Sequence, residues 1–495
     1  MKYEKVRFCT DLPTKSQPEL GKILVTGATG YIGGRLVPEL LERGYKVRIM
    51  VRSTFPGIEE RWPGVEVVYA DARDLESLLK ALEGIHTAYY LIHSLQLGYK
   101  KFESADIQAA VNFRIAAENQ DIQRIIYLCG LGNAQTNLST HLANRIKVAE
   151  KLSEGKIPVT ALRAAMIIGS GSASYEILEN LIRNAPVFFI PYWAKTKNQP
   201  ISIRDVIKYL VGVLEIPGTK GKTFDIGGSN VTTYDEMLKT IAEIQGKKRF
   251  FFPSPFSWTP LYGYIASLLT PVPGPITKVL MEGCKNEVVC QNNDIKEYLN
   301  FEPLSYHEAL LRATTLEQDD NIATRWSDAY PPEHELAAKL HQIKPLPRYT
   351  SSYCLLSYKD SKSIFQSFCN IGGKMGWFNS NWMWRLRGFL DRILMGVGSS
   401  RGRRSNSSLR PDDVIDFWRV ENIVNNKMLL LRAEMKLPGK AWLEFHTDTY
   451  EGLNKFTVNA YFQSSGFWGR IYWYSFLPFH MFIFKDLLKQ IEKRS

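Results

Sequence analysis

The sequence has few residues of the kinds that bind metal ions or form disulfide bonds: six cysteines and eight histidines among 495 residues. No two cysteines form a CxxC pair, and the segment PEHEL lacks the second histidine of an HExxH zinc motif. No pair of histidines has the helical spacing of metal ligands either. We therefore expect neither a bound metal ion nor a disulfide framework.

Long apolar runs are also missing. The most apolar late stretch, IYWYSFLPFHMFIF at residues 471–484, is too short to span a bilayer and contains Pro478 and His480. The opening segment, MKYEKVRFCTDLPTKSQ, lacks the apolar core of a signal peptide. Together with the unpaired cysteines, these features predict a cytoplasmic protein, either free or peripheral to the inner face of a membrane.

Acidic residues are fewer than basic ones, 50 against 62, so the net charge is +12. This balance suits anionic ligands, nucleic acid or a membrane surface. No motif that reads a nucleic-acid groove is present, so we expect no nucleic-acid partner. The densest basic cluster, SSRGRRSNSSLR at residues 399–410, predicts a solvated loop, with contact to phosphate or lipid headgroups as the alternative.

The first third of the chain alternates short β-branched runs with helical patterns. The runs are KILVTG, KVRIMVR, VEVVYA, TAYYLIH, RIIYLCG and VTALRAAMIIG. Such alternation predicts βαβ units, and hence a Rossmann-type, doubly wound parallel sheet of the α/β class. Pro-rich and aromatic stretches within residues 170–313 predict the substrate side of the crevice. A membrane-facing surface is the alternative for residues 250–276.

The periodicity changes after a polar segment at residues 319–348, which we expect to be a linker. The segments DVIDFWRVEN, KMLLLRAEMKL, KAWLEFHTDTY and NKFTVNAYFQ alternate in period two, which predicts an antiparallel sheet. The expected parts are a tail at 1–20, an α/β domain at 21–318, the linker, and an α+β domain at 349–495. A final amphipathic helix is predicted by the spacing of Trp473, Leu477, Met481, Phe484, Leu488 and Ile491.

Glycines crowd the segment ILVTGATGYIGGRL at residues 23–36, although glycine disfavours helices more than any residue except proline. They fall where a strand should end and a helix should begin. Gly27 allows a sharp turn, Gly30 leaves room for a pyrophosphate beside the backbone, and Gly33 lets the helix pack closely on the strand. Free N–H groups at the helix N-terminus then favour an anion.

In this setting TGATGYIG resembles the nucleotide-binding fingerprint of extended and atypical short-chain dehydrogenases/reductases. The resemblance covers residues 21 to about 313 through YADARDLESL, AYYLIHS, LRAAMIIGSGSASYE, PISIRDV and TFDIGG. This group includes NmrA-type regulators and the NADPH-binding accessory subunit of respiratory complex I. The resemblance implies an NAD(P) cofactor whose phosphates contact the turn residues Gly27, Ala28, Thr29, Gly30, Tyr31, Ile32 and Gly33.

The end of the second predicted strand favours NADP over NAD. An acidic residue at that position would bind the 2′-hydroxyl of NAD, but this chain has Arg52 and Ser53. A guanidinium suits a 2′-phosphate, and Arg35 in the first helix is a candidate for a second contact. The alternative is that both arginines are ordinary solvated side chains.

Further cofactor contacts are expected where later strands end. Asp71, followed by Ala72, resembles the family's acidic residue near the adenine, and a helix N-cap or a charge facing Arg73 is the alternative. His93 and Ser94 end the fourth predicted strand. Ligands bind at the carboxyl edge of such a sheet, so we expect both residues to contact cofactor or substrate.

The family's catalytic Tyr-x-x-x-Lys motif is missing. The matching stretch, HLANR, places His141 and Arg145 in the Tyr and Lys positions. His141 is a candidate acid because an unperturbed imidazole titrates near neutral pH, and Arg145 can bind ribose hydroxyls as a fixed cation. The alternative for His141 is an ordinary helical histidine. Lys147 lies off the required spacing, and Cys129 is expected to be a buried core thiol.

The C-terminal stretches resemble a domain of unknown function that is fused to such proteins, on the segments IGGKMGWFNSNWMWRLRGFLD, AEMKLPGKAWLEF and GRIYWYSFLPFHMFIF. Their element order is similar to helix-grip folds of the START and polyketide-cyclase type. The resemblance implies a curved sheet around a long helix and an apolar cavity. Trp377, Trp382 and Trp384 either line that cavity or belong to the core.

Three functions remain open. The first is an NADP(H)-dependent oxidoreductase that acts on a small hydrophobic carbonyl or quinone-like compound. The second is a nucleotide-binding sensor or assembly factor without turnover, and the third is a nucleotide-sugar epimerase or dehydratase, which relies on the missing tyrosine. The first is favoured because Arg145 preserves the cation and His141 preserves a titratable group.

Overall fold

The computed structural model describes residues 7–52, 61–93, 102–132, 137–318, 324–329 and 339–495, apart from positions 374, 378, 380, 400, 402, 404, 406 and 407. The chain divides into two compact units after residue 329, and residues 270–274 are counted with the second unit. Each unit has its own hydrophobic core. Residues 324–329, which we expected in the linker, therefore pack as part of the first unit.

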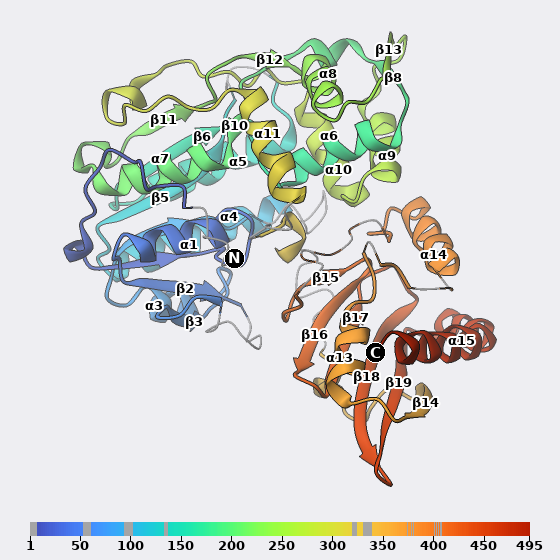
Figure 1. Ribbon diagram of the computed structural model, residues 1–495. Helices are drawn as coiled ribbons and strands as arrows, with labels where there is room; N and C mark the ends of the chain where they lie inside the picture. The colour runs from blue at the N-terminus through green and yellow to red at the C-terminus, as the bar shows by residue number, and fades with distance from the viewer. Residues whose placement is uncertain are drawn as a thin grey trace. The chain divides into compact units, whose positions relative to one another are not determined.

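A parallel sheet forms the centre of the first unit (Figure 1). Its strands are β1 (Lys22–Val25), β2 (Val47–Val51), β3 (Glu66–Tyr69), β4 (Ile85–Tyr90), β5 (Arg124–Gly130), β6 (Val159–Ala164) and β11 (Thr223–Ile226). Seven strands lie in the order β11-β6-β5-β4-β1-β2-β3, and each neighbouring pair is parallel. The order reverses between β1 and β4, as in a doubly wound sheet. The predicted Rossmann-like arrangement is confirmed.

Helices cover both faces of this sheet. The helices of the first unit are α1 (Gly33–Glu42), α3 (Leu75–Leu82), α4 (Phe102–Asn119), α5 (Thr140–Ser153), α6 (Ala173–Asn184), α7 (Ile203–Glu215), α8 (Tyr234–Ile244), α9 (Thr259–Leu269), α10 (Gly274–Gly283) and α11 (Tyr306–Gln318), of which α1, α3, α4, α5 and α7 pack on the sheet. On one face, Leu78, Phe113 and Val148 of α3, α4 and α5 pack against the strands. Helices α1 and α7 pack on each other and on the opposite face. The central strands are mostly apolar because both of their faces are covered.

Three short strand pairs build the region beyond β6. They are β7 (Ile167–Ile168) with β10 (Ile201–Ser202), β8 (Val187–Ile190) with β13 (Phe250–Pro253), and β9 (Lys197–Asn198) with β12 (Thr232–Thr233). A second core joins them to α6, α8 and α11. This region lies at the carboxyl ends of the central strands, where open parallel sheets bind ligands.

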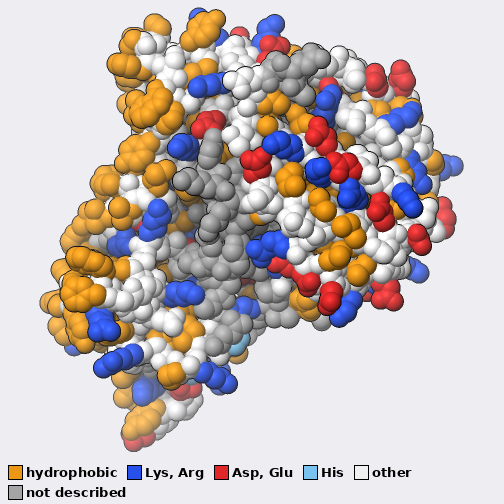
Figure 2. Space-filling view, turned by 180° about the vertical axis from the view of Figure 1, so that it is seen from behind, with side chains coloured by type: hydrophobic (Ala, Val, Ile, Leu, Met, Phe, Trp, Pro, Cys, Tyr) orange, Lys and Arg blue, Asp and Glu red, His pale blue; other side chains and the backbone are white. Residues whose placement is uncertain are grey.

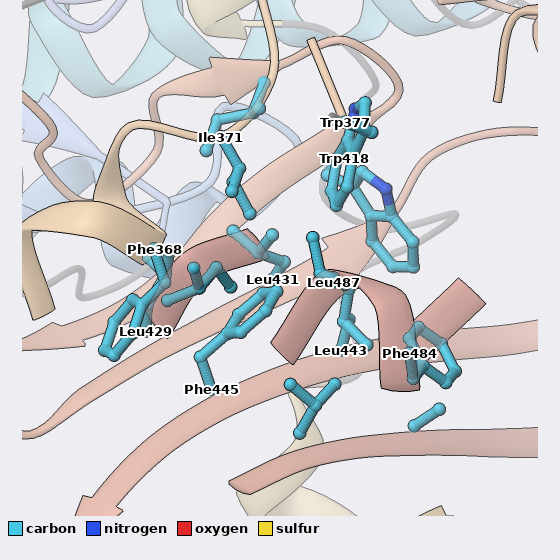
Figure 3. Packing of buried hydrophobic residues seen from close by; sticks show 14 of the residues in the cluster. Phe368, Ile371, Trp377, Trp418, Leu429, Leu431, Leu443, Phe445, Phe484 and Leu487 are labelled. Carbon is cyan, nitrogen blue, oxygen red and sulfur yellow. The ribbon is translucent and has the colours of Figure 1, made fainter. Parts of the chain in front are cut away.

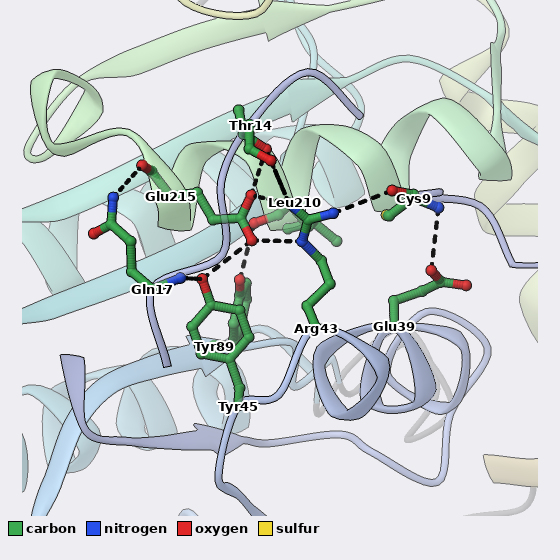
Figure 4. Close-up of polar contacts among 9 residues, drawn as sticks. All are labelled: Cys9, Thr14, Gln17, Glu39, Arg43, Tyr45, Tyr89, Leu210 and Glu215. Atoms are coloured by element: carbon green, nitrogen blue, oxygen red, sulfur yellow. Dashed lines mark hydrogen bonds and ion pairs between the residues drawn. The ribbon is translucent and has the colours of Figure 1, made fainter. Parts of the chain in front are cut away.

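The N-terminal segment is held on the first unit instead of extending from it (Figure 4). Glu215, the last residue of α7, accepts hydrogen bonds from Arg43 Nε at 2.6 Å and from the hydroxyl of Tyr45 at 3.1 Å. The backbone amide of Cys9 donates to Glu39, and the carbonyl of Cys9 accepts from Arg43. The described part of the predicted tail is therefore tied to α1 and α7.

The second unit is built on an antiparallel sheet. Its strands are β14 (Tyr349–Ser357), β15 (Val414–Ile415), β16 (Trp418–Val424), β17 (Met428–Ala433), β18 (Gly439–Tyr450) and β19 (Leu453–Ser464), and its helices are α13 (Ser361–Cys369), α14 (Asn381–Ile393) and α15 (Phe467–Arg494). The six strands lie in the order β14-β19-β18-β17-β16-β15. The period-two segments of the sequence form β15 to β19, so the predicted antiparallel sheet and final helix are confirmed.

The core of the second unit lies between this sheet and the helices α13 and α15 (Figure 3). Phe368 of α13 stacks on Phe445 of β18, with ring centroids 5.5 Å apart. Trp377 is buried and donates its indole N–H to Asp416, at 2.8 Å. Trp384 packs against Trp377, with centroids 4.6 Å apart. These two tryptophans belong to the core, whereas Trp382 is 65% exposed.

One face of α15 packs on the sheet in both halves of the helix: Trp473 is buried and stacks on Phe462 of β19, with ring centroids 5.8 Å apart. Phe484, Leu488 and Ile491 are buried, as the apolar spacing predicts, but Met481 is 42% exposed. The predicted apolar stripe is therefore confirmed at Trp473 and in the second half of the helix, and it is wrong at Met481. Among the described residues, no helix combines the length and the apolarity that crossing a bilayer requires.

Two arginines in the described part of the basic cluster at 399–410 are buried, whereas the composition of the cluster predicts solvated side chains. Arg401 is buried and binds Glu434 at 2.7 Å and the carbonyl oxygen of Asp416 at 2.9 Å. Arg403 is also buried and donates to the carbonyl oxygen of Ile371 at 2.9 Å. Both guanidinium groups are used inside the unit, so neither is placed to contact a lipid headgroup.

Candidate functional site

The glycine-rich turn joins β1 to α1 and leaves little room for side chains. Gly27 has φ of +63°, a region that favours glycine, and a Cβ there would lie 2.7 Å from the carbonyl oxygen of Leu91. A Cβ on Gly33 would overlap the carbonyl oxygen of Gly27 and lie 2.8 Å from the Cα of Ala28. At Gly30 it would meet Gly27 alone among the described residues, at 3.3 Å. The turn therefore has no room for a side chain at Gly27 and Gly33, whereas the backbone at Gly30 is open to a ligand.

The N-terminus of α1 lies in this turn with unpaired amide groups. Its N-cap residue, Ile32, makes no capping hydrogen bond. Within the described ranges, the backbone N–H groups of Ile32 and Gly33 donate to no acceptor. Such N–H groups bind phosphates together with the positive end of the helix dipole. The residues present thus fit a dinucleotide pyrophosphate, as the spacing of the glycines predicts.

Arg35 binds backbone carbonyl oxygens and is not placed to bind a 2′-phosphate. Its buried guanidinium donates to the carbonyl oxygens of Tyr31 at 3.2 Å, Thr324 at 2.9 Å and Ser170 at 2.9 Å. It also lies 4.1 Å from the centroid of the Tyr31 ring. These bonds tie residues 324–329 to the start of α1. The geometry therefore gives Arg35 a structural role that differs from the expected one.

Arg52 keeps the position that we expected for it. It follows the last residue of β2 and its side chain is exposed. Ser53 lies outside the described residues. Asp71 forms the ion pair with Arg73 that we named as its alternative, at 2.7 Å. Although partial burial acts to raise the pKa of Asp71, the hydrogen bonds from Arg73 hold it below its usual value. Ala72 is buried beside this pair.

His93 lies at the carboxyl edge of the sheet and is held by a carboxylate. Its Nδ1 is 3.2 Å from Oδ2 of Asp106 on α4, and the same oxygen accepts from Asn144 Nδ2 at 3.0 Å. A carboxylate only accepts, so it assigns the proton to Nδ1 and leaves Nε2 as an acceptor. In the described part of the chain Nε2 is buried and has no hydrogen-bond partner. Ser94 lies outside the described residues.

His141 lies in the first turn of α5, next to His93, with ring centroids 5.0 Å apart. Burial, and then the nearby His93 and Arg145, lower the pKa of His141 well below 6.5. Burial also lowers the pKa of His93, despite its bond to Asp106. Both imidazoles are therefore neutral at pH 7. This corrects the expectation of an acid that titrates near neutral pH.

Arg145 follows His141 by one turn of α5. Its guanidinium donates to the carbonyl oxygen of Leu128 and lies 4.8 Å from the centroid of the Tyr127 ring. Cys129 is buried and donates to the carbonyl oxygen of Arg145 at 3.3 Å, and burial raises the pKa of its thiol. Cys129 is thus a core thiol, as predicted. Lys147 pairs with a surface glutamate instead.

A cavity of about 770 Å³ connects these parts. Tyr31 and Ile32 of the turn line one end of it, together with His93, His141 and Arg145. Arg145 is the one permanently charged side chain on the described wall. Most of the remaining wall is apolar and comes from the expected substrate-side region at 170–313, including Leu178, Phe188, Trp193, Leu238, Tyr262 and Met281.

The cavity wall includes residues that are also exposed on the surface. Phe189 is 60% exposed, Phe256 67% and Ile265 42%. Phe250 and Trp258, in the same part of the chain, are also exposed. A membrane-facing surface at 250–276 stays a prediction.

The sequence analysis missed two residues of this site, Asp106 and Asn144. Both are buried, and together they fix the orientation of His93. One signal was available in the sequence. Asp106 falls on the face of α4 that carries Ala109, Ala110 and Phe113, and a carboxylate on an apolar face needs a partner.

Comparison with known proteins agrees with this division of the chain. The description "NmrA-like family" applies to residues 19–249, and "Protein of unknown function (DUF2867)" applies to residues 347–487. Among solved structures, a nucleoside-diphosphate-sugar epimerase of Staphylococcus aureus is 19% identical with a TM-score of 0.48, and covers 59% of this chain and 99% of its own. Triphenylmethane reductase of Citrobacter sp. is 22% identical with a TM-score of 0.48, and covers 59% of this chain and 99% of its own.

Several curated proteins match part of the chain. NADH dehydrogenase (ubiquinone) 1 alpha subcomplex subunit 9 of Dictyostelium discoideum is 29% identical over 228 residues, which are 44% of this chain and 62% of that protein. Photosystem II assembly factor Ycf39 of Trieres chinensis is 25% identical over 232 residues, which are 46% of this chain and 69% of that protein. A 3β-hydroxysteroid dehydrogenase/Δ5→4-isomerase of Mycobacterium tuberculosis is 30% identical over 118 residues, which are 22% of this chain and 31% of that protein.

The matched stretch thus spans less than two thirds of the first and third of these relatives. Fold, glycine-rich turn and family descriptions agree on the two parts of the chain. Residues 19–249, on a Rossmann-like sheet, thus match the NmrA-like family, and residues 347–487 match DUF2867, a family of unknown function.

Proposed function

We propose that this protein is an NADP(H)-dependent reductase that acts on a hydrophobic carbonyl or quinone-like compound. One observation carries the proposal: a single cavity joins the glycine-rich turn, two neutral histidines and an apolar chamber. A nucleotide at the turn and an apolar substrate in the chamber would meet beside His141. This is the arrangement that hydride transfer requires, because the reacting atoms must be held in contact.

The turn supplies the nucleotide site. Gly30 leaves the backbone accessible, and the N–H groups of Ile32 and Gly33 are free to bind a pyrophosphate. The exposed Arg52 is the residue that we assign to a 2′-phosphate, since Arg35 is committed to backbone carbonyls. When bound, a reduced nicotinamide would supply the hydride.

The histidines handle the proton that accompanies the hydride. A neutral imidazole can donate a hydrogen bond to a carbonyl oxygen and polarise it, so His141 needs no positive charge for this role. As the oxygen gains electron density, the N–H of His141 transfers its proton to it, and a proton from water then restores the neutral imidazole. The pair of His93 and Asp106 lies beside His141 and holds its proton acceptor, Nε2, toward the cavity.

The lining of the cavity supports a hydrophobic substrate. Arg145 is the one permanent charge on the described wall, and its guanidinium is bound to a backbone carbonyl. The diphosphate of a nucleotide sugar would need several donors or cations in that chamber, so an epimerase is not favoured. One curated relative of the first unit is described as a hydroxysteroid dehydrogenase, which agrees with an apolar substrate.

The test starts with the nucleotide that stays with the purified protein, identified by mass spectrometry. Oxidation of NADPH is then followed across a panel of apolar aldehydes, ketones and quinones. The variant His141→Phe should lower kcat/KM roughly hundredfold with unchanged NADPH affinity, because general acid–base groups contribute that much. His307→Phe, at an exposed histidine of α11, is the matched control. Equal turnover by both variants would remove His141 from the mechanism.

A nucleotide-binding assembly factor without turnover is the second candidate. Two observations favour it: the missing Tyr and Lys, and the engagement of Arg145 with Leu128, which keeps the guanidinium from moving freely toward a ribose. One relative is described as an assembly factor. A protein that retains NADPH but oxidises it with no member of the panel would support this candidate over the reductase.

For the second unit we propose a helix-grip arrangement. Its support is the antiparallel sheet followed by one long C-terminal helix whose second half packs on that sheet. The tryptophans that were candidates for a ligand cavity are part of the core, so the proposal assigns no ligand to them.

A further inference from the structure

The first half of α15 exposes an unusual amount of aromatic surface. The five largest exposed side chains there are between 51% and 73% accessible: Phe467, Trp468, Tyr474, Phe479 and Phe482. At about 100° per residue these positions span about 140° of the helix circumference, on the side opposite to the buried Gly469 and Trp473. They therefore do not form a narrow stripe that one neighbouring element of the unit could cover.

Helix α14 exposes a second apolar face in the same unit. Trp382 is 65% exposed, Leu386 50%, Phe389 57% and Leu390 47%. The start of α14 is linked to α15 by a hydrogen bond of 3.3 Å from Asn379 to Asp486. Figure 1 places both helices at the same side of the second unit. We call the exposed apolar residues of α14 and of residues 467–482 the aromatic face.

The charged groups on the aromatic face are basic. Arg385 and Arg470 are exposed, and Lys436 lies beside α14, where it donates to the carbonyl oxygen of Leu394. Residues 467–484 contain no acidic residue. The acid of α14, Asp391, is buried and accepts from the backbone amides of Gly398 and Lys436.

Figure 2 shows the same combination on the surface. Hydrophobic side chains, with Lys and Arg among them, gather at the side of the second unit where Figure 1 places α14 and α15. An exposed apolar area of this kind marks an interaction site, because its contact with water is costly.

We propose that the aromatic face docks on an anionic lipid bilayer, with its aromatic side chains in the interface and its arginines at the headgroups. Tryptophan and tyrosine are enriched at this depth because their rings are apolar and their N–H or O–H groups remain hydrated. A helix that packs on its own sheet through one face and exposes bulky aromatic side chains on the opposite face suits the interface of a bilayer. The exposed arginines of the aromatic face complement anionic headgroups.

The proposal does not depend on nucleotide binding or turnover, so its test is separate from that of the reductase. The full-length protein is mixed with vesicles of phosphatidylcholine and phosphatidylglycerol, or of phosphatidylcholine alone, and bound protein is measured by flotation. We expect binding to the mixed vesicles that weakens with added salt, since salt screens the headgroup charges.

Three double variants divide the face into its parts. Trp468→Ser with Phe482→Ser, and Trp382→Ser with Phe389→Ser, should each lower the partition coefficient roughly tenfold or more, because each removes two large apolar groups from the interface. Arg385→Gln with Arg470→Gln should abolish the preference for anionic vesicles. All six positions are exposed, so the unfolding temperature should stay unchanged. Tyr358→Ser, at a residue that is 93% exposed after β14, is the matched control.

Two results would overturn the proposal. One is vesicle binding that the aromatic variants leave unchanged, or that the parent protein lacks on both kinds of vesicle. The other is a dimer in sedimentation analysis that these variants dissociate, with no vesicle binding. That outcome would assign the aromatic face to a second copy of the chain.

Discussion

His93 and Asp106 form a bonded pair in the wall of the cavity, with Nδ1 of the imidazole 3.2 Å from Oδ2 of the carboxylate. Asn144 donates to the same oxygen, so the carboxylate is held from a second side. The pair fixes one tautomer of His93 and leaves its Nε2 as an acceptor next to His141. A histidine oriented in this way is ready to exchange a proton with its neighbour.

The variant Asp106→Asn tests this relationship. An amide can bind either form of the imidazole, so the tautomer of His93 should no longer be fixed, and kcat/KM should fall roughly hundredfold. The ¹⁵N shifts of the imidazole report the tautomer without any turnover. Glu103→Gln, at an acid on the surface of the same helix, is the control. An unchanged tautomer and rate in Asp106→Asn would show that the carboxylate serves packing alone.

Two glycines of the turn should respond differently to the same substitution. In Gly30→Ala the new Cβ meets a single described atom at 3.3 Å, so the fold should persist while NADPH affinity falls at least tenfold. In Gly33→Ala the Cβ lies 2.8 Å from the Cα of Ala28, so the turn itself must move and the unfolding temperature should fall. Calorimetry of binding and of unfolding separates the two. Normal NADPH affinity in Gly30→Ala would place the pyrophosphate elsewhere.

Arg52 should decide between the two nucleotides. Removing its guanidinium in Arg52→Ala takes away a charge-assisted bond to the 2′-phosphate and should weaken NADPH roughly ten- to a hundredfold, with little effect on NADH. Titration with each nucleotide measures this difference. Lys80→Ala, at an exposed cation on α3, is the control for net charge. Equal losses for NADPH and NADH would exclude Arg52 from the 2′-phosphate.

Much of the first unit is predictable from local sequence alone. Each central strand is a short apolar run that is buried on both faces, and a turn rich in glycine follows the first of them. The period-two segments of the second unit identify its strands in the same way. In both cases the pattern reports how residues close in sequence share one environment.

The failures concern residues that meet across long distances in sequence. Arg35 binds carbonyl oxygens of Ser170 and Thr324, and Arg401 binds Glu434, so these arginines are buried although their neighbours suggest solvent or a ligand. No local period reports which distant carbonyl or carboxylate a guanidinium will reach. The prediction of the histidine site missed Asp106 for the same reason, because Asp106 lies on a different helix from His141.

The ion pair of Arg43, which follows α1, with Glu215 at the end of α7 should stabilise the first unit. The exposed fractions of these side chains are 15% and 0%, so Arg43→Met leaves a buried carboxylate without its cation. The cost should be about 3 kcal/mol of unfolding free energy. Arg7→Met is the matched control, since the pair of Arg7 and Glu42 is more exposed and should be worth less than about 1 kcal/mol. Similar losses in both variants, measured by urea unfolding, would contradict this account.

His480 should make the second unit sensitive to acid. It packs between Trp473 and Phe484, with ring centroids 5.1 and 5.2 Å away, and burial lowers its pKa from 6.5 to about 4. Between these values the unfolded chain binds the proton and the folded chain does not, so stability is full above pH 6.5 and is lost as the pH falls toward 4.

The loss approaches about 3 kcal/mol at pH 4, because one pKa unit is worth about 1.4 kcal/mol. His480→Phe keeps the ring in its apolar contacts and removes the titration. We therefore expect this variant to match the parent protein at pH 7 and to exceed its stability at pH 4.5, as measured by the urea midpoint of the second unit. His446→Gln, at a histidine of β18 paired with Asp448, is the control. If the midpoints of His480→Phe and the parent shift equally between the two pH values, the proton that unfolds this unit binds elsewhere.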